Sequence, residues 1–235
     1  GVPSGIPAAS ASATTADAAT IAPEETHPRQ VPSQLITVDT DVLHLLVDTR
    51  GGSLVRADLL AYPNKAPTRK DANPAPTVLL NNDPTHYFVA QNGLVSSSDT
   101  AAQDQPNHLA LFQSAQTSYT LTAGQNELQV VLSWHDAAGL NVTKTYTFKR
   151  GSYVIGLSQR IENDGAQPWQ GNAYQQLQRV APPKASSWLS HYTDPEQRSF
   201  VGAAWYTGEK FEKLEFKNFG DKKDALDSQI KGGWA

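Results

Sequence analysis

The strongest constraint on the fold is a series of alternating apolar and polar residues interrupted by glycine turns. The stretch HLLVDTRGGSLVRADLL (44–60) has two such runs on either side of Gly51-Gly52. Period-two alternation indicates β-strands with two unlike faces, and glycine adopts the positive φ that tight turns need. The stretch therefore predicts a β-hairpin. One face would carry Leu43, Leu45 and Val47 in the first strand and Val55, Ala57 and Leu59 in the second.

The same pattern is repeated in the middle of the chain. Apolar residues alternate with polar ones in 128–134, 142–148 and 153–161. Asp136-Ala137-Ala138-Gly139 and Arg150-Gly151 separate these runs, and Asn163-Asp164-Gly165 follows the last one. Because β-branched and aromatic residues favour pleated surfaces, these runs predict an antiparallel meander.

The remaining segments give weaker signals. Residues 62–76, 91–107 and 181–198 are rich in proline or in polar side chains and are predicted to be long loops. Residues 208–219 fit either a helix or a strand, and 221–229 are a second weak helix candidate. No internal repeat is visible, which disfavours a propeller or solenoid. More than eight short strands with polar turns predict an all-β, mainly antiparallel sandwich of two large sheets.

Residues 1–33 differ from the rest of the chain. Ala, Pro, Ser and Thr supply 21 of these 33 residues, and none is aromatic. Such a segment buries too little apolar surface to offset its ordering entropy, so it is expected to be disordered. It is either an inert tail or a tether between an upstream anchor and the folded domain. The predicted organisation is thus a tether, 1–33, and a folded domain, 34–235.

The overall composition narrows the function classes. The net charge of −4 and the absence of any basic run argue against a nucleic-acid surface. The chain has no cysteine, which excludes disulfides and thiolate chemistry. No stretch approaches the roughly 20 apolar residues that span a bilayer. Methionine is absent even at position 1, so the chain is expected to be an internal fragment.

No established catalytic motif is present. The chain contains no nucleophile elbow, P-loop, HExxH or GxGxxG sequence. The six histidines are not paired at ligand spacing, and His44 and His135 are expected to serve surface or turn structure. No carboxylate pair stands out as a glycosidase pair. We therefore assign no catalytic, metal-binding or cofactor-binding residue.

The aromatic residues are unevenly distributed, because all five tryptophans lie at or after position 134. Such rings are the usual material of cores and loop packing. The alternative is a cleft that stacks a sugar or an extended peptide. The candidate cleft or partner contacts are Tyr174, Trp188, Tyr192 and Trp205.

Several stretches resemble a known family when taken together and in order. They are ITVDTDVLHLLVDTRGGSLVRADLLAYP (36–63), TAGQNELQV (122–130), DAAGLNVTKTYTFKRGSYVI (136–155) and KGGW (231–234). They resemble the large periplasmic domain of YidC, in the YidC/Oxa1/Alb3 family of bacterial membrane protein insertases. The resemblance runs from about residue 35 to the end.

The resemblance implies a β-supersandwich similar to galactose-mutarotase-like domains, here C-terminally incomplete. It implies a place on the periplasmic side of the bacterial inner membrane, after an N-terminal membrane helix and a variable linker. It also implies a non-catalytic role, without cofactor, in assisting insertion and folding through contacts with Sec translocon components or nascent chains. A carbohydrate-binding or mutarotase-like enzyme domain and a passive spacer are the alternatives.

Overall fold

The computed structural model describes residues 32–96, 105–181, 200, 202–206 and 209–218. These residues fall into two compact units. The larger unit holds the described residues up to Leu80 together with Val89–Leu177, and the smaller holds Asn81–Phe88 and the described residues from Gln178 onward. We describe each unit by itself.

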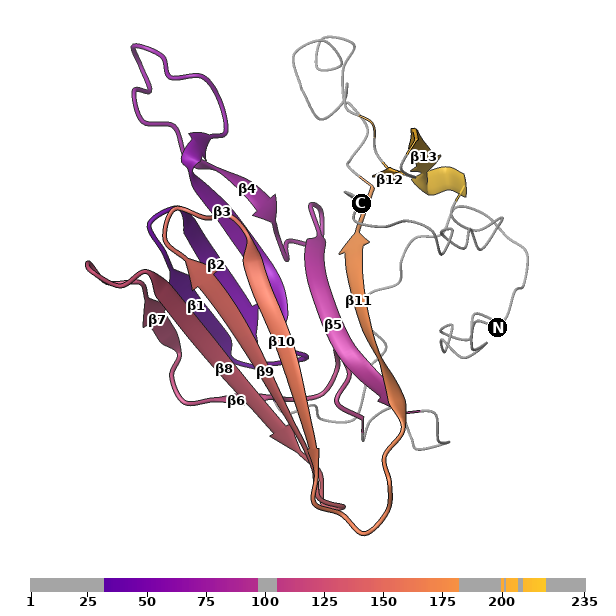
Figure 1. Ribbon diagram of the computed structural model, residues 1–235. Coiled ribbons are helices and arrows are strands. Elements are labelled where there is room, and N and C mark those ends of the chain that lie inside the picture. The colour runs from indigo at the N-terminus through magenta and orange to yellow at the C-terminus, as the bar shows by residue number, and fades with distance from the viewer. Residues whose placement is uncertain (1–31, 97–104, 182–199, 201, 207–208, 219–235) are drawn as a thin grey trace. The chain divides into compact units, whose positions relative to one another are not determined.

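Two sheets form the larger unit (Figure 1). The first has the order β11-β5-β3-β2-β1-β7, with β4 paired to β3. Its strands are β1 (Leu35–Asp39), β2 (Leu43–Asp48), β3 (Ser53–Pro63), β4 (Pro76–Leu80), β5 (Phe88–Ser96), β7 (Ser118–Thr120) and β11 (Gly171–Arg179). The second has the order β10-β9-β8-β6. Its strands are β6 (Gln113–Ser114), β8 (Glu127–His135), β9 (Leu140–Lys149) and β10 (Ile155–Asn163).

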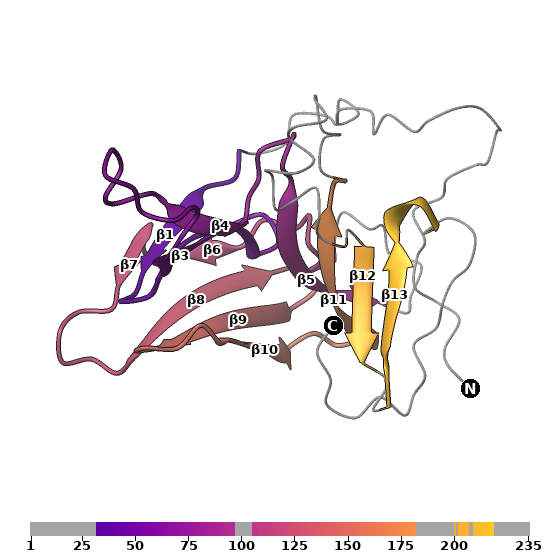
Figure 2. The same cartoon turned by 90° about the horizontal axis from the view of Figure 1, so that it is seen from above.

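The two sheets form separate layers with the core between them (Figure 2). The β1–β7 pair is parallel, whereas β1–β2, β2–β3, β3–β4 and every pair of the second sheet are antiparallel. Fully buried apolar side chains come from both layers, among them Ile36, Val38, Leu45, Val47, Val89, Leu94, Val130, Leu132, Val142 and Phe148. The predicted all-β, mainly antiparallel sandwich is thereby confirmed.

The first predicted hairpin is present as β2 and β3. Leu43, Leu45 and Val47 are buried as predicted, and Gly51 and Gly52 have φ values of 70° and 60°. The second strand differs from the prediction, because the β2–β3 register shifts between Leu46 and Val47. This β-bulge breaks the strict alternation along β3. Leu54 therefore lies opposite Val47, and Leu54 and Val55 are both buried. Asp58 lies on the opposite face of β3 from Ala57, where it is buried and pairs with Arg56 at 3.0 Å.

The predicted meander is confirmed as β8, β9 and β10. Alternate residues of β8 and β9 are buried, and Gly139 has a φ of 100° in the turn between them. β10 pairs with β9 from Ile155 to Asn163 and lies at the end of its sheet. The edge position explains why β10 is more exposed than β9.

The prediction of a long loop over 91–107 is wrong in its first part, because β5 extends to Ser96. Asn92 is one of the polar residues on which the loop prediction rests. The Asn92 side chain is buried and bonded to Tyr146, and a Cβ on Gly93 would lie 2.7 Å from the Asn107 Cα. Contacts distant in the sequence therefore override the local polar signal. Residues 97–104 lie outside the described part.

The smaller unit contains the hairpin of β12 (Gly202–Tyr206) and β13 (Phe211–Glu215). The 3-10 helix η2 (Phe216–Asn218) follows. The strand interpretation of 208–219 is thus confirmed over 211–215, and the helix interpretation is wrong there. Exposure along β13 alternates with period two, as in a strand. The tether up to residue 31, the loop over 182–199 and the helix candidate 221–229 lie outside the described residues.

Gly51 and Gly151 give a matched test of the hairpin turn. Both have a φ of 70°, so alanine at either position incurs the left-handed cost of about 1–2 kcal/mol. A Cβ on Gly151 would meet open space, whereas on Gly51 it would lie 2.3 Å from the His108 carbonyl oxygen. We expect Gly51→Ala to lower the free energy of unfolding by about 2 kcal/mol more than Gly151→Ala. Urea unfolding measures both, and equal losses would contradict the close approach.

Candidate functional site

A lysine lies in the core between the two sheets. Lys144 is in β9, and its side chain has no exposed surface. Its Nζ donates hydrogen bonds to the Gly51 carbonyl at 2.7 Å and to the Asn92 carbonyl at 3.0 Å. Gly51 belongs to the β2–β3 turn and Asn92 to β5, so one amine joins the second sheet to two segments of the first.

Tyr146 makes a second connection from the same strand. Its hydroxyl donates to the Gly52 carbonyl at 2.5 Å and accepts from the Asn92 Nδ2 at 2.8 Å. Lys144 and Tyr146 are two residues apart, so both side chains point to the same face of β9. The Asn92 Oδ1 is buried and has no hydrogen-bond partner among the described residues. We call Lys144, Tyr146 and Asn92 the buried polar cluster.

The cluster lies in an apolar environment that changes its acid–base properties. Within the described part of the chain no carboxylate pairs with Lys144, and the Phe112 ring lies 4.4 Å from its Nζ. Burial lowers the pKa of Lys144 to about 7. Burial also raises the pKa of Tyr146 to about 12, although the hydrogen bond from Asn92 opposes this rise.

The geometry of the cluster gives it a structural role. The amine is sealed from solvent and its described hydrogen bonds go to backbone carbonyls, so a solute in water cannot reach it. Sequence reasoning missed this group. The signal was present, because position 144 belongs to the same alternating set as Val142, Tyr146 and Phe148. A charged residue in a buried set requires internal partners.

Tyr174, one of the predicted contact residues, is half-buried in β11. Its hydroxyl lies 2.5 Å from the His108 Nδ1 and accepts from the His108 backbone N–H at 2.9 Å. Burial, and secondarily the positive charge of Lys144, lowers the pKa of His108. Tyr174 therefore holds the segment around His108 against β11. Its predicted part in a cleft or partner contact stays a prediction.

The other predicted contact residues belong to the smaller unit or lie outside the described residues. Trp205 is half-buried in β12 of the smaller unit, where it pairs in register with Glu212. Trp188 and Tyr192 lie within 182–199, outside the described residues. Their roles stay predictions.

The two singled-out histidines have different surroundings. His44 and Asp39 face each other across β1 and β2, with 2.6 Å between Nδ1 and Oδ1. His135 is exposed at the end of β8, and the adjacent Asp136 carboxylate accepts from the Leu140 N–H within the turn. No group of three or more His, Asp or Glu residues within the described ranges could hold a metal ion.

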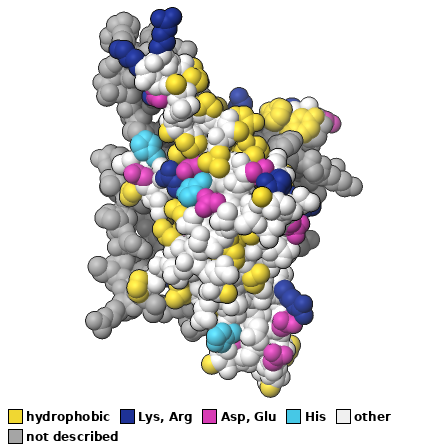
Figure 3. All heavy atoms as spheres, turned by 90° about the vertical axis from the view of Figure 1, so that its left-hand side faces the viewer, with side chains coloured by type: hydrophobic (Ala, Val, Ile, Leu, Met, Phe, Trp, Pro, Cys, Tyr) yellow, Lys and Arg dark blue, Asp and Glu magenta, His cyan; other side chains and the backbone are white. Residues whose placement is uncertain are grey.

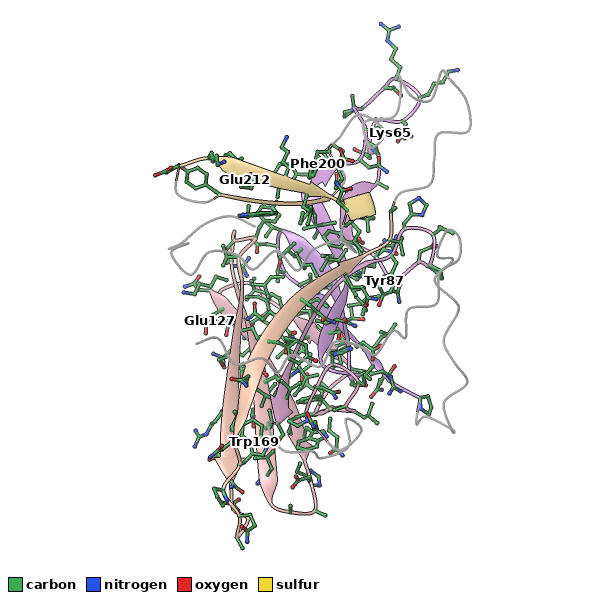
Figure 4. The ribbon with its side chains drawn as sticks, turned by 90° about the vertical axis from the view of Figure 1, so that its right-hand side faces the viewer. Lys65, Tyr87, Glu127, Trp169, Phe200 and Glu212 are labelled. Atoms are coloured by element: carbon green, nitrogen blue, oxygen red, sulfur yellow. The ribbon has the colours of Figure 1, made fainter. Side chains whose placement is uncertain are left out.

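The sheets end in strands with an open edge. β10 and β11 are terminal in their sheets, and no described strand pairs with their outer edges. Each carries an exposed apolar side chain, Ile161 at 41% and Leu177 at 64%. Figure 4 shows the molecule from the side of β11, with Trp169 at the end where β11 begins and Lys65 at the opposite end. The accessible features are thus strand edges and side chains on the outer surface.

Replacing Lys144 by methionine is expected to flatten the pH dependence of stability between about pH 7 and 9.5. The folded pKa lies below the ordinary value of 10.5, so in this range the unfolded chain holds the additional proton. Stability therefore rises with pH in the wild type, and relative to Lys144→Met the rise is up to about 1.4 kcal/mol per pH unit.

Urea unfolding at each pH measures this difference. Lys149→Met, at the exposed end of the same strand, is the control and should keep the wild-type slope. The range stops below pH 10 because the raised pKa of Tyr146 lowers stability above that value. If Lys144→Met keeps the wild-type slope, the amine is not buried as described.

Comparison with known proteins identifies the family. The model of the YidC periplasmic domain matches residues 35–235. Proteins named membrane protein insertase YidC are 36% identical in Thioalkalivibrio sulfidiphilus and 40% identical in Methylococcus capsulatus, over 91% and 88% of this chain. The Pseudomonas putida protein of that name is 35% identical over 100% of this chain.

The alignments cover 36%, 35% and 40% of these three relatives, so the chain spans a little over a third of their length. Among the described residues, no helix has the length and apolar character to cross a membrane. The family match begins where β1 begins and includes every strand of both units. The chain belongs to the YidC periplasmic domain family.

Proposed function

We propose that this chain is the periplasmic part of a bacterial inner-membrane insertase, and that it assists insertion and folding of membrane proteins without covalent chemistry. The family match and the names of the relatives support this proposal. The domain would assist insertion through contacts with Sec translocon components or with extended segments of nascent chains. No catalytic side chain or cofactor takes part.

The main structural support for this mechanism is the open edge of β10. An edge strand presents unpaired backbone N–H and C=O groups that an extended chain can join by β-pairing. β10 is nine residues long and pairs on one side with β9. Ile161, on the same face of the sheet as its partner Val142, is 41% exposed and offers an apolar contact beside that edge. An extended segment with alternating apolar side chains is the partner that this edge suits.

The surroundings of the titratable groups support a non-catalytic role. Mutarotase chemistry needs a histidine and a carboxylate on two sides of a bound sugar. Among the described residues, His44 and Asp39 come nearest to such a pair, and their 2.6 Å contact leaves no space for a substrate between them. Lys144 is sealed in the core. Aldose anomer interconversion faster than in buffer, measured by polarimetry and lost in His44→Ala, would instead support the enzyme alternative.

Introducing a charge at the β10 edge tests the docking proposal. Ile161→Asp is expected to weaken binding of the purified chain to the Sec translocon, or to an unfolded membrane-protein segment, by about tenfold or more. The introduced carboxylate would lose its hydration at the contact and gain no oppositely charged partner, which costs free energy of binding. Val131→Asp is the matched control, because Val131 is 44% exposed but lies in β8, which is paired on both sides.

Biolayer interferometry with each immobilised partner measures the affinities, and thermal unfolding confirms that both variants are folded. Equal affinities for Ile161→Asp, Val131→Asp and the wild type would contradict docking at β10. If deletion of 34–235 from the intact insertase leaves both insertion and Sec association unchanged, the domain is a passive spacer and the proposal fails.

A further inference from the structure

The loop between β3 and β4 concentrates positive charge at one end of the larger unit. Residues 64–75 contain Lys65, Arg69 and Lys70 but a single acidic residue, Asp71. All three cationic side chains are exposed. Lys65 pairs with Asp71 at 2.7 Å, and among the described residues no carboxylate pairs with Arg69 or Lys70. This local excess stands out in a chain whose net charge is −4.

Exposed aromatic and aliphatic side chains lie beside this loop. Tyr62, at the end of β3, is 55% exposed, and its ring centroid is 5.5 Å from that of Tyr153. Val154 follows Tyr153 in the chain and is 76% exposed. Figure 3 shows Lys and Arg side chains at the upper tip and hydrophobic side chains gathered below them.

The β3–β4 hairpin itself adds to this apolar surface. Val78 pairs in register with Asp58, and Leu60 follows Asp58 by two residues, so Val78 and Leu60 lie on the same face of the hairpin. They are 40% and 45% exposed. We call the loop 64–75 with Leu60, Tyr62, Val78, Tyr153 and Val154 the hairpin tip.

We propose that the hairpin tip docks on the surface of a membrane that contains anionic lipids. The cationic side chains at the outer end of the tip are attracted to anionic headgroups. Each Lys or Arg near the surface raises the membrane affinity about fivefold. Tyrosine suits the level of the headgroups, because its ring is apolar and its hydroxyl stays wet. Valine and leucine behind these groups supply apolar area that can be buried at the acyl boundary.

The chemistry of the tip favours lipid over a protein partner. Protein interfaces are depleted in lysine, whereas two of the three cations here are lysines. Arg69 and Lys70 have no described carboxylate partner. Their positive charges can therefore attract the phosphate groups of a membrane surface without needing a fixed geometry. The proposal is independent of the β10 edge, because none of the tip residues belongs to β10.

Vesicle co-sedimentation of the purified chain tests the charge contribution. The wild type is expected to bind vesicles of phosphatidylcholine with phosphatidylglycerol, and to bind pure phosphatidylcholine much more weakly. Arg69→Gln with Lys70→Gln should lower the partition coefficient on anionic vesicles by about 30-fold. Lys149→Gln with Arg160→Gln removes the same two charges from β9 and β10, giving −6 from −4 in both variants, and should stay near the wild-type value.

The apolar contribution has its own matched pair. Val154→Ser should weaken binding several-fold, whereas Leu177→Ser, which removes a side chain 64% exposed in β11, should not. Absence of wild-type binding to anionic vesicles, or equal losses in each variant and its control, would overturn the proposal. It would also be overturned if Arg69→Gln with Lys70→Gln abolished binding to the purified Sec translocon while vesicle binding was unchanged.

Discussion

The amine of Lys144 is the interaction on which the arrangement of the two sheets depends. It donates from β9 to the carbonyls of Gly51 and Asn92, and Tyr146 repeats the connection to Gly52. A buried ammonium without a described carboxylate is costly, and burial lowers its pKa to about 7. In the neutral form the amine still donates to both carbonyls. The β2–β3 turn thus has its backbone carbonyls satisfied by a titratable group that lies in the core.

This arrangement also explains the two glycines of the turn. A Cβ on Gly51 would collide with the backbone of His108, and one on Gly52 would lie 3.4 Å from the Lys144 side chain. Both positions of the turn therefore need positive φ, and Gly51 also needs the absence of a side chain. The hairpin that the sequence predicts is local, but its place against the second sheet is fixed by a residue 93 positions away.

Local alternation was sufficient to predict the fold class and the strands β2, β3, β8, β9 and β10. It identified the buried face of β2 and the meander of β8 to β10, because each of those strands has one face in the core. It failed at Asn92, whose amide is paired with Tyr146 from the other sheet, and at Leu54, which a bulge places opposite Val47. A local pattern contains neither the partner from the other sheet nor the register shift between two paired strands.

The candidate site was harder to predict than the fold. Lys144 belongs to an alternating set that is buried, but a lysine in a strand is usually solvated, so the local pattern does not predict its burial. The hairpin tip could not be predicted from the sequence for a different reason. Its residues come from β3, β4 and the turn before β10, so only the pairing of strands and the Tyr62–Tyr153 contact bring them together. Of the predicted aromatic contacts, Tyr174 takes part in packing, through its hydroxyl on His108.

The core of the larger unit is closed to solvent, whereas the features that a partner could contact lie on its surface. Burial shifts the pKa values of Lys144 and Tyr146, and both side chains face inward and bond to backbone carbonyls. The exposed features are strand edges, apolar side chains and a cationic loop, all of which suit non-covalent contacts. The domain would thus work through its surface, at β10 for extended polypeptide and at the hairpin tip for lipid.

Amine labelling of the folded chain tests directly whether Lys144 is sealed in the core. A water-soluble acetylating reagent at pH 7.5, with the products mapped by mass spectrometry, compares Lys144 with the exposed Lys65, Lys70 and Lys149. We expect the exposed lysines to be modified and Lys144 to be protected until the protein unfolds. If Lys144 reacts first in the folded protein, its amine is accessible and nucleophilic, and the claim that the core contains no reacting side chain is wrong.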